Sequence, residues 1–385
     1  MSRYDRSLRF LVVDDDDEMR RFLAATLRVL GFKIVRQVRE GQEGIDLLKQ
    51  LPMDFVLSDW EMPGMDGMAL LREMRAEPMW DLVPFLLLSA NINAEVAAEA
   101  EDYGADGHLL KPIRQDVLMS AIQRIVEYRD VFTEIYILTS RAKALADASV
   151  REDAYEEIRK AQMKYPGNPM VWNESGLVLS ILGEQEMAEW CHKRAIELNR
   201  RFLKAYDSLG ALYFNQRRFS DARLILEKAV LLSPRNKFRH REIGKACLAE
   251  GFVEKARSWF YEAVALEGNS GARHAAVGEI FFELERADLA EHDFSQACQT
   301  DPGMIHYYNR LGIALRRQGK LKEAAQNYKR AINIAPGDPI VYYNYAIALS
   351  ELKDIPQAKA SLQRSLALDP GFNEAQALLD RLSHS

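Results

Sequence analysis

From Ile135 onward the chain repeats itself every 34 residues, and seven copies align from residue 135 to 372 without an insertion. The eighth position of each copy is small and the twentieth is always alanine. Two antiparallel helices pack closely only where both present small side chains, so each copy is predicted to be a helix pair. One pair cannot bury its own apolar face, and the copies are therefore expected to stack. The alanines are Ala154, Ala188, Ala222, Ala256, Ala290, Ala324 and Ala358.

Large side chains at the fourth position, such as Trp172 and Tyr206, fill the space between neighbouring copies in this interpretation. The pattern resembles the tetratricopeptide repeat over about 240 residues. The resemblance implies an all-α superhelical solenoid, and the segment 373–382 is predicted to be a final capping helix. It also implies a concave groove for a peptide or a partner helix, lined by Tyr136, Lys143, Asn173, Asp207, Phe214, Phe238, Arg241, Lys245, Asn309, Arg316 and Tyr343.

The first 130 residues follow a different pattern, in which short apolar runs alternate with amphipathic segments. Alternating strands and helices predict a parallel sheet covered on both faces, here an α/β doubly wound sheet of five strands. Strands are expected near 9–14, 33–37, 54–59, 84–89 and 107–110, and helices near 18–30, 41–50, 67–76, 92–103 and 114–128.

Polar residues stand at the end of four of these predicted strands. Asp14 and Asp15 end the first, Asp59 the third and Ser89 the fourth, and Lys111 follows the fifth. The carboxyl ends of parallel strands form the usual ligand site of an open α/β sheet. Three carboxylates, a hydroxyl and an ammonium group are therefore expected to converge there. Clustered carboxylates raise one another's pKa unless a cation lies among them, and Mg²⁺ suits such a site.

These motifs, in this order, resemble the chemotaxis-type, flavodoxin-like receiver domain of two-component response regulators. The resemblance implies that a sensor histidine kinase phosphorylates Asp59. Asp15 and Asp59 would bind Mg²⁺ or Mn²⁺ directly, Asp14 through water, and Glu61 through its backbone carbonyl. Lys111 would pair with the phosphoryl oxygens, and Ser89 would donate a hydrogen bond to one of them.

The chain departs from the receiver pattern at His108, where receivers often carry Tyr or Phe. An imidazole could still take two positions and could titrate near neutral pH, so His108 is retained as a switch residue. Receivers often hold the peptide bond before the following proline, here Pro112, in the cis form.

The joint between the two regions contains neither Gly nor Pro between Pro112 and Pro166. Apolar residues keep a helical spacing across it, so the last receiver helix either runs into the first repeat helix or stops near Asp130 and restarts at Thr133. The sequence Ser149–Glu152 matches a capping box and predicts the start of the next helix. We assign residues 1–130 to the receiver and 131–385 to the repeats. A homodimer through the receiver or the 114–147 helical joint is left open, beside simple interdomain packing.

Composition argues against several other classes of protein. Residues 1–130 hold 16 basic against 24 acidic side chains, and the remainder holds 35 against 33, which is too few positive charges for nucleic-acid binding by bulk charge. The three cysteines, at 191, 247 and 298, lie far apart and are expected to be buried free thiols. The sequence shows no apolar run of 18 residues, no leader pattern and no DNA-binding helix-turn-helix, so a cytoplasmic protein is expected.

The sequence thus predicts a response regulator in which phosphorylation of Asp59 modulates protein binding by the repeats. We find no enzymatic site beyond Mg²⁺-dependent phosphoryl transfer to and from Asp59. Three alternatives stay open at this point. The protein could be a phosphate sink or relay, a constitutive scaffold that docks to a kinase, or a regulator that binds nucleic acid.

Overall fold

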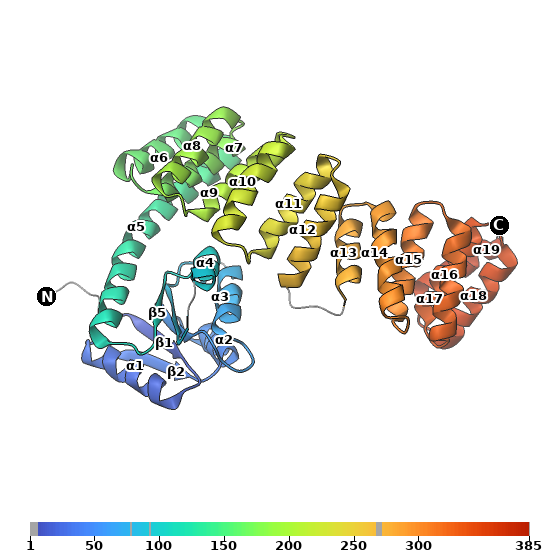
Figure 1. Cartoon of the computed structure of the whole chain (residues 1–385), viewed down its shortest axis with the longest axis horizontal. Helices are drawn as coiled ribbons and strands as arrows, with labels where there is room; N and C mark the ends of the chain where they lie inside the picture. The colour runs from blue at the N-terminus through green and yellow to red at the C-terminus, as the bar shows by residue number, and fades with distance from the viewer. Residues whose placement is uncertain (1–6, 78, 92–93, 267–271, 385) are drawn as a thin grey trace. The chain divides into compact units, whose positions relative to one another are not determined.

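The computed structural model of the protein describes residues 7–77, 79–91, 94–266 and 272–384. The chain divides into two compact units, Met1–Glu250 and Gly251–Ser385 (Figure 1). The first unit contains the sheet together with the helices up to the middle of the fourth repeat, and the second contains the remaining repeats. The boundary that the sequence places after residue 130 therefore lies inside the first unit. No helix of the described residues combines the length and apolar character needed to cross a membrane.

A five-stranded parallel sheet forms the core of the N-terminal region. Its strands are β1 (Arg9–Val13), β2 (Ile34–Val38), β3 (Phe55–Asp59), β4 (Phe85–Ser89) and β5 (Gly107–Leu110), and their order is β2-β1-β3-β4-β5. Each strand lies within one residue of its predicted limits. The doubly wound sheet predicted from the sequence is confirmed.

Helices cover both faces of this sheet, and alternate residues of the central strands face opposite layers. Phe10 and Val12 of β1 pack with residues of α1 (Asp17–Val29) and α5 (Gln115–Asp147). Leu11 and Val13 pack instead with residues of α2 (Gly41–Gln50), α3 (Gly67–Ala76) and α4 (Ala94–Asp102). The predicted start of α4 at residues 92–93 lies outside the described residues. This two-sided burial explains why the strands are almost entirely apolar.

The joint is one continuous helix, α5, which begins in the receiver and ends in the first repeat. Leu118 and Ile122, near its start, belong to the sheet's core, whereas Ala142 and Ala146 belong to the core of the repeats. Between these ends, Arg129 Nη2 donates to Asp106 Oδ2 at 3.0 Å. The first of the two alternatives for the joint is therefore correct.

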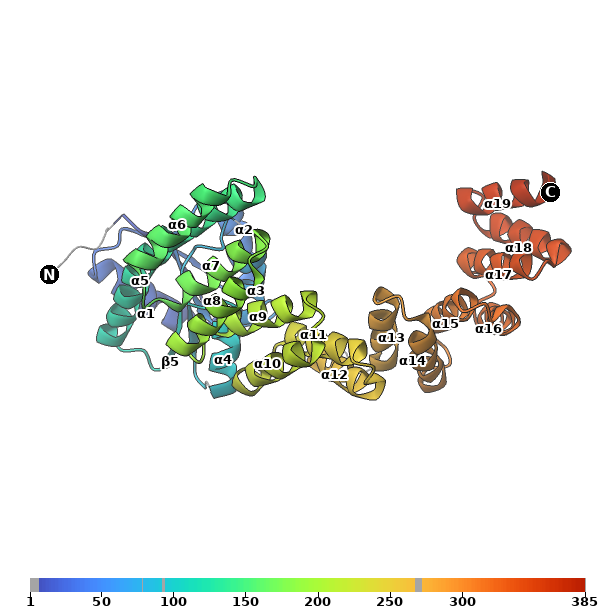
Figure 2. The same ribbon diagram turned by 90° about the horizontal axis from the view of Figure 1, so that it is seen from above.

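In the repeat region of the first unit, each helix packs against the next one along the chain (Figure 2). After α5 come α6 (Arg151–Lys164), α7 (Pro169–Ile181), α8 (Gln185–Leu198), α9 (Leu203–Asn215), α10 (Phe219–Leu232) and α11 (Lys237–Ala249).

The second unit continues the series with α12 (Val253–Leu266), α13 (Arg273–Glu283), α14 (Ala287–Thr300), α15 (Ile305–Arg317), α16 (Leu321–Ile334), α17 (Pro339–Glu351) and α18 (Ile355–Leu368). The predicted capping helix is α19 (Asn373–His384). All three cysteines are buried free thiols, as predicted.

In four of the copies, the glycine at the eighth position packs against the residue sixteen positions later. A methyl group added to Gly176 would lie 2.6 Å from the His192 ring, and one added to Gly312 would lie 2.5 Å from the Tyr328 ring. Gly210 and Gly278 meet Leu226 and Phe294 in the same way. The close approach of the two helices of a copy, predicted from the small residues, is therefore present.

The fifteenth position of each copy has a left-handed backbone, which the sequence does not reveal. Ser149 has φ 62°, and Gly183, Arg217, Gly251, Glu285, Gly319 and Lys353 share the positive φ. This turn overturns the predicted capping box, because Ser149 lies outside the helix. Helix α6 begins at Arg151, one residue later than a cap at Ser149 would place it, and its cap residue Val150 makes no side-chain cap hydrogen bond.

Candidate functional site

The acidic site lies where β1 and β3 end. Asp14 is fully buried, Asp59 is nearly so and Asp15 is exposed. Each of the three offers one carboxylate oxygen, and these atoms all lie within 4.8 Å of one another. The predicted convergence of Asp14, Asp15 and Asp59 is therefore present.

Lys111, just after β5, places its ammonium group on this cluster. Its Nζ lies 3.0 Å from Asp14 Oδ2 and 2.8 Å from Asp59 Oδ2. Burial disfavours the charged form of Lys111, but its hydrogen bonds to Asp59 and Asp14 outweigh burial and raise its pKa. Burial raises the pKa of Asp14, which the hydrogen bond from Lys111 only partly offsets. The next peptide bond, Lys111–Pro112, is cis.

The backbone holds Asp59 in place. The Trp60 amide donates to Asp59 Oδ1 at 2.9 Å, and the Gly67 amide donates to the Trp60 carbonyl at 3.0 Å. A Cβ atom at Gly67 would lie 2.1 Å from the Asp59 carbonyl oxygen. Only glycine therefore fits at the start of α3, because this residue lies against the backbone of Asp59.

The other predicted site residues surround this centre. Ser89 is buried at the end of β4, and its hydroxyl donates to the Asn91 carbonyl at 3.2 Å. Glu61 is exposed in the loop after β3. His108 is half-buried on β5, beside Leu87 of β4. Their predicted roles toward a metal ion or a phosphoryl group stay predictions.

The acidic cluster fits a hard divalent cation. Carboxylate oxygens are the ligands that Mg²⁺ and Mn²⁺ prefer, and three of them converge here from two strand ends. The ammonium group of Lys111 neutralises part of this charge in the structure. Asp14, Asp15 and Asp59 are thus the side chains able to hold such an ion.

The predicted groove residues of the first unit do not share one environment. Phe214, Phe238 and Asp207 line a cavity of about 280 Å³, and Tyr136 and Lys143 are exposed on α5. Asn173 is instead buried, with its Oδ1 3.0 Å from His192 Nδ1, and so it faces the interior of its copy. Two further groove residues lie on α11. Lys245 donates to Glu242 at 2.7 Å, and Arg241 is half-buried.

The groove residues of the second unit all have partners of their own. Arg316 pairs with Glu351 at 2.6 Å, and Asn309 accepts a hydrogen bond from Asn344 at 2.8 Å. The ring of Tyr343 packs on that of Phe372, with centroids 4.9 Å apart.

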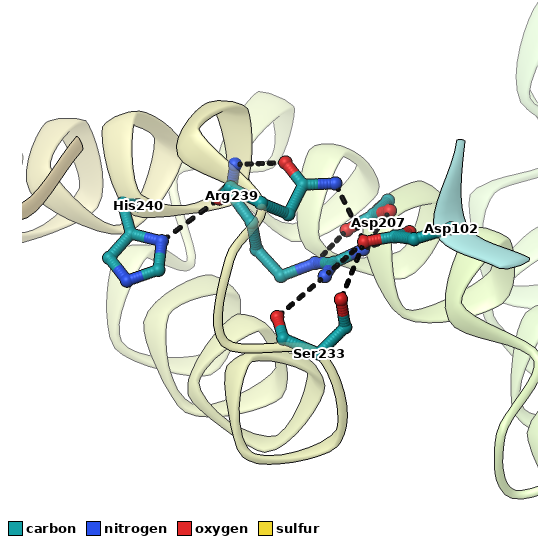
Figure 3. Close-up of polar contacts among 6 residues, drawn as sticks. Asp102, Asp207, Ser233, Arg239 and His240 are labelled. Carbon is teal, nitrogen blue, oxygen red and sulfur yellow. Dashed lines mark hydrogen bonds and ion pairs between the residues drawn. The ribbon is translucent and has the colours of Figure 1, made fainter. Parts of the chain in front are cut away.

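Sequence reasoning missed a second polar cluster in the first unit. Asp102 at the end of α4 meets Arg239 at the start of α11, together with Ser233 and Asn236 (Figure 3). Arg239 holds the third position of its copy, which is not among the positions expected to line the groove. No pattern in the sequence connects it with Asp102.

Comparison with known proteins agrees with both regions. A family model described as the response regulator receiver domain matches residues 10–123. Three models described as tetratricopeptide repeat match residues 202–233, 277–339 and 315–382.

Individual relatives cover the first region. The chain is 34% identical to chemotaxis protein CheY-3 of Vibrio cholerae serotype O1 over 123 residues, which are 32% of this chain and 95% of that protein. It is 35% identical to chemotaxis protein CheY of Pseudomonas aeruginosa over 120 residues, which are 31% of this chain and 97% of that protein. The structure of chemotaxis response regulator CheY4 of Vibrio cholerae is similar with 28% identity and a TM-score of 0.30, over 31% of this chain and 98% of that one. The chain therefore belongs to the response regulator receiver family, and its receiver domain is followed by tetratricopeptide repeats.

Proposed function

We propose that this response regulator accepts a phosphoryl group on Asp59 and thereby changes the binding of a protein partner by its repeats. The observation that carries the proposal is the cluster of Asp14, Asp15 and Asp59 with Lys111 paired to Asp59 at 2.8 Å. The donor would be the phosphohistidine of a sensor kinase or of a phosphotransfer protein.

The chemistry is a transfer between two nucleophiles. A carboxylate oxygen of Asp59 bonds to phosphorus while the phosphorus–nitrogen bond of the phosphohistidine breaks, and the histidine leaves with the electron pair of that bond. Lys111 lies where its ammonium group would neutralise phosphoryl oxygens on Asp59. A bound Mg²⁺, held by Asp14, Asp15 and Asp59, would supply further positive charge against those oxygens. Ser89 would turn from the Asn91 carbonyl to donate to the phosphoryl group.

Binding of a partner by the repeats is the output that we propose, because helix pairs fill the described chain after the receiver. We propose no enzymatic output beyond phosphoryl transfer and no nucleic-acid binding. A cytoplasmic location belongs to the same proposal. A phosphate sink, or a scaffold that docks constitutively to a kinase, is the competing function. It would need Asp59 but no partner whose binding depends on phosphorylation.

A pull-down from native lysate separates these functions. The wild-type chain with Mg²⁺ and beryllofluoride, which mimics an acyl phosphate, is compared with Asp59→Asn under the same conditions. Asp46→Asn, which changes an exposed carboxylate of α2, is the matched control. A protein whose recovery differs in Asp59→Asn but not in the control supports the proposal. Identical sets of recovered proteins would refute the phosphorylation-dependent output and favour the scaffold or sink.

A further inference from the structure

Asp102, the last residue of α4, is bound by the repeats. Its Oδ2 accepts hydrogen bonds from Ser233 Oγ at 3.0 Å, Asn236 Nδ2 at 2.8 Å and Arg239 Nη1 at 3.0 Å, and its Oδ1 accepts from Arg239 Nη2 at 3.0 Å (Figure 3). The side chains of Asp102 and Arg239 are 4% and 1% exposed. Two parallel bonds from a guanidinium group to a carboxylate are the geometry by which arginine recognises carboxylates.

Contacts within the repeats hold these donors in position. Asp207 of α9 accepts from Arg239 Nε and Nη2 at 2.8 Å each, which fixes the plane of the guanidinium group. Asn236 caps α11 by accepting from the Arg239 amide at 3.1 Å, and its Nδ2 is thereby turned toward Asp102. The start of a helix also favours a negative charge. The arrangement is therefore a carboxylate site built by α9, by the turn between α10 and α11, and by the start of α11, and Asp102 is its ligand.

A second carboxylate of α4 makes a parallel contact. Glu99 Oε2 lies 3.0 Å from Arg235 Nε of the repeats, and Glu99 Oε1 lies 3.2 Å from Arg72 Nη2 of α3. The repeats thus present two arginines to two acids on the same receiver helix. In the sequence α4 begins only five residues after Ser89, so a rearrangement at the phosphoryl site has a short path to this contact.

The surroundings of Arg239 indicate what else could bind there. Arg239 and Asn236 also line the cavity of about 280 Å³, whose wall includes the apolar side chains of Phe214, Leu226 and Phe238. A ligand with a carboxylate beside an apolar side chain would match both features. Acidic peptides have this chemistry.

We propose that Ser233, Asn236 and Arg239 form a binding site for a carboxylate of an acidic peptide, and that Asp102 occupies this site as an internal ligand. The receiver then excludes the peptide until α4 withdraws. The inference rests on the proposed function only in assuming that the repeats bind a protein ligand. It can be tested without phosphorylation, because removal of the Asp102 carboxylate should free the site.

The probe is a fluorescein-labelled synthetic peptide with the sequence of residues 94–106, which carries the acids of α4. It is titrated against the full chain as wild type, as Asp102→Ala and as Glu101→Ala, without a phosphoryl donor. Glu101→Ala removes the adjacent exposed carboxylate and is the matched control. We expect Asp102→Ala to bind the peptide at least about tenfold more tightly than the wild type or the control, since charge-assisted hydrogen bonds are involved.

Arg239→Lys in the Asp102→Ala background tests the site itself. Lysine keeps the charge but loses the two parallel bonds, so the gain in affinity should disappear. Ser233→Ala provides a milder second variant, expected to weaken binding several-fold, and circular dichroism confirms that each variant is folded. Equal binding by wild type and Asp102→Ala, or binding that is indifferent to both repeat substitutions, would overturn the proposal.

Adding Mg²⁺ and beryllofluoride to the wild type then tests the proposed function separately. Increased peptide binding would show that the phosphoryl site frees the carboxylate site. A gain for Asp102→Ala without a response to beryllofluoride would support the carboxylate site and contradict its control by phosphorylation.

Discussion

Lys111 Nζ lies 2.8 Å from Asp59 Oδ2 and 3.0 Å from Asp14 Oδ2, so one ammonium group joins two of the three carboxylates of the acidic site. A divalent cation bound by the same carboxylates would stand close to this ammonium group. The two positive charges would repel each other, and Lys111 would compete with the metal for Asp14 and Asp59. Lys111 should therefore have opposite effects on metal binding and on phosphorylation.

Replacing Lys111 with methionine is expected to tighten Mg²⁺ binding by at least about fivefold, or ~1 kcal/mol, because a divalent and a unit positive charge ~4 Å apart repel each other by roughly 2 kcal/mol in bulk water. The same substitution should slow phosphorylation by acetyl phosphate, because the phosphoryl oxygens lose a positive charge. Calorimetric Mg²⁺ titration and the rate of acyl-phosphate formation measure the two effects. Lys49→Met, at an exposed position of α2, should change neither. Weaker Mg²⁺ binding by Lys111→Met would contradict the competition.

The acidic site could be predicted from the sequence because its residues sit at the ends of apolar runs, which fix both the strands and the edge where they meet. The groove was less predictable. Asn173 was placed on the concave face by its position in the repeat, yet it is buried against His192. Asn173 faces inward because the residue at the twenty-fourth position of its copy, His192, contacts it. An average repeat pattern does not specify the residue at that position.

The contact between Asp102 and Arg239 could not be predicted at all, because it joins residues 137 positions apart that belong to unrelated patterns. The continuity of α5 was one of two alternatives, since helical spacing alone does not exclude a break. Periodicity thus determines the elements, whereas contacts between regions depend on individual side chains.

The close packing of Gly312 against Tyr328 should make Gly312→Ala destabilising. Tyr328 is fully buried, and the new methyl group would lie 2.5 Å from its ring. We expect a net loss of about 1–2 kcal/mol in the free energy of unfolding of this segment, after the better helix propensity of alanine is included. Urea denaturation measures the loss, and Gly337→Ala, where no atom lies within 4 Å of the new methyl group, is the control.

A second substitution identifies the cause of this loss. The last copy carries Ala346 at the equivalent position and Leu362 in place of the tyrosine, and both are buried in one cluster. Tyr328→Leu should therefore restore much of the stability that Gly312→Ala removes. A double variant no more stable than Gly312→Ala alone would exclude the steric explanation.

The buried imidazole of His192 should make stability fall in mild acid. Burial lowers the pKa of His192 to about 4, whereas an unfolded chain binds the proton near pH 6.5. Between pH 6.5 and pH 4 the unfolded state therefore binds a proton that the folded state does not. As the pH falls through this range, the free energy of unfolding should decrease by up to about 3 kcal/mol. Above pH 6.5 the contribution is constant.

The variant His192→Leu, which copies Leu226 of the next repeat, lacks this proton. Because other titrating groups are common to both chains, the difference between them isolates the histidine. When the pH is lowered from 7.5 to 5, the free energy of unfolding measured by urea denaturation should fall by about 2 kcal/mol more in the wild type than in the variant. If the difference in the free energy of unfolding between wild type and variant does not change with pH, His192 is accessible to protons in the folded chain.

The left-handed turn at the fifteenth repeat position gives a pair of substitutions with opposite expected signs. Lys353 adopts φ 64°, which costs a residue with a Cβ roughly 1 kcal/mol, while Gly319 occupies the equivalent turn with φ 76°. Lys353→Gly should therefore raise the free energy of unfolding by up to about 1 kcal/mol, and Gly319→Ala should lower it by about 1 kcal/mol. A Cβ at Gly319 would meet no atom within 4 Å, so the backbone alone accounts for the loss. Urea denaturation of both variants checks the signs, and a destabilised Lys353→Gly would show that the lysine side chain contributes more than its backbone conformation costs.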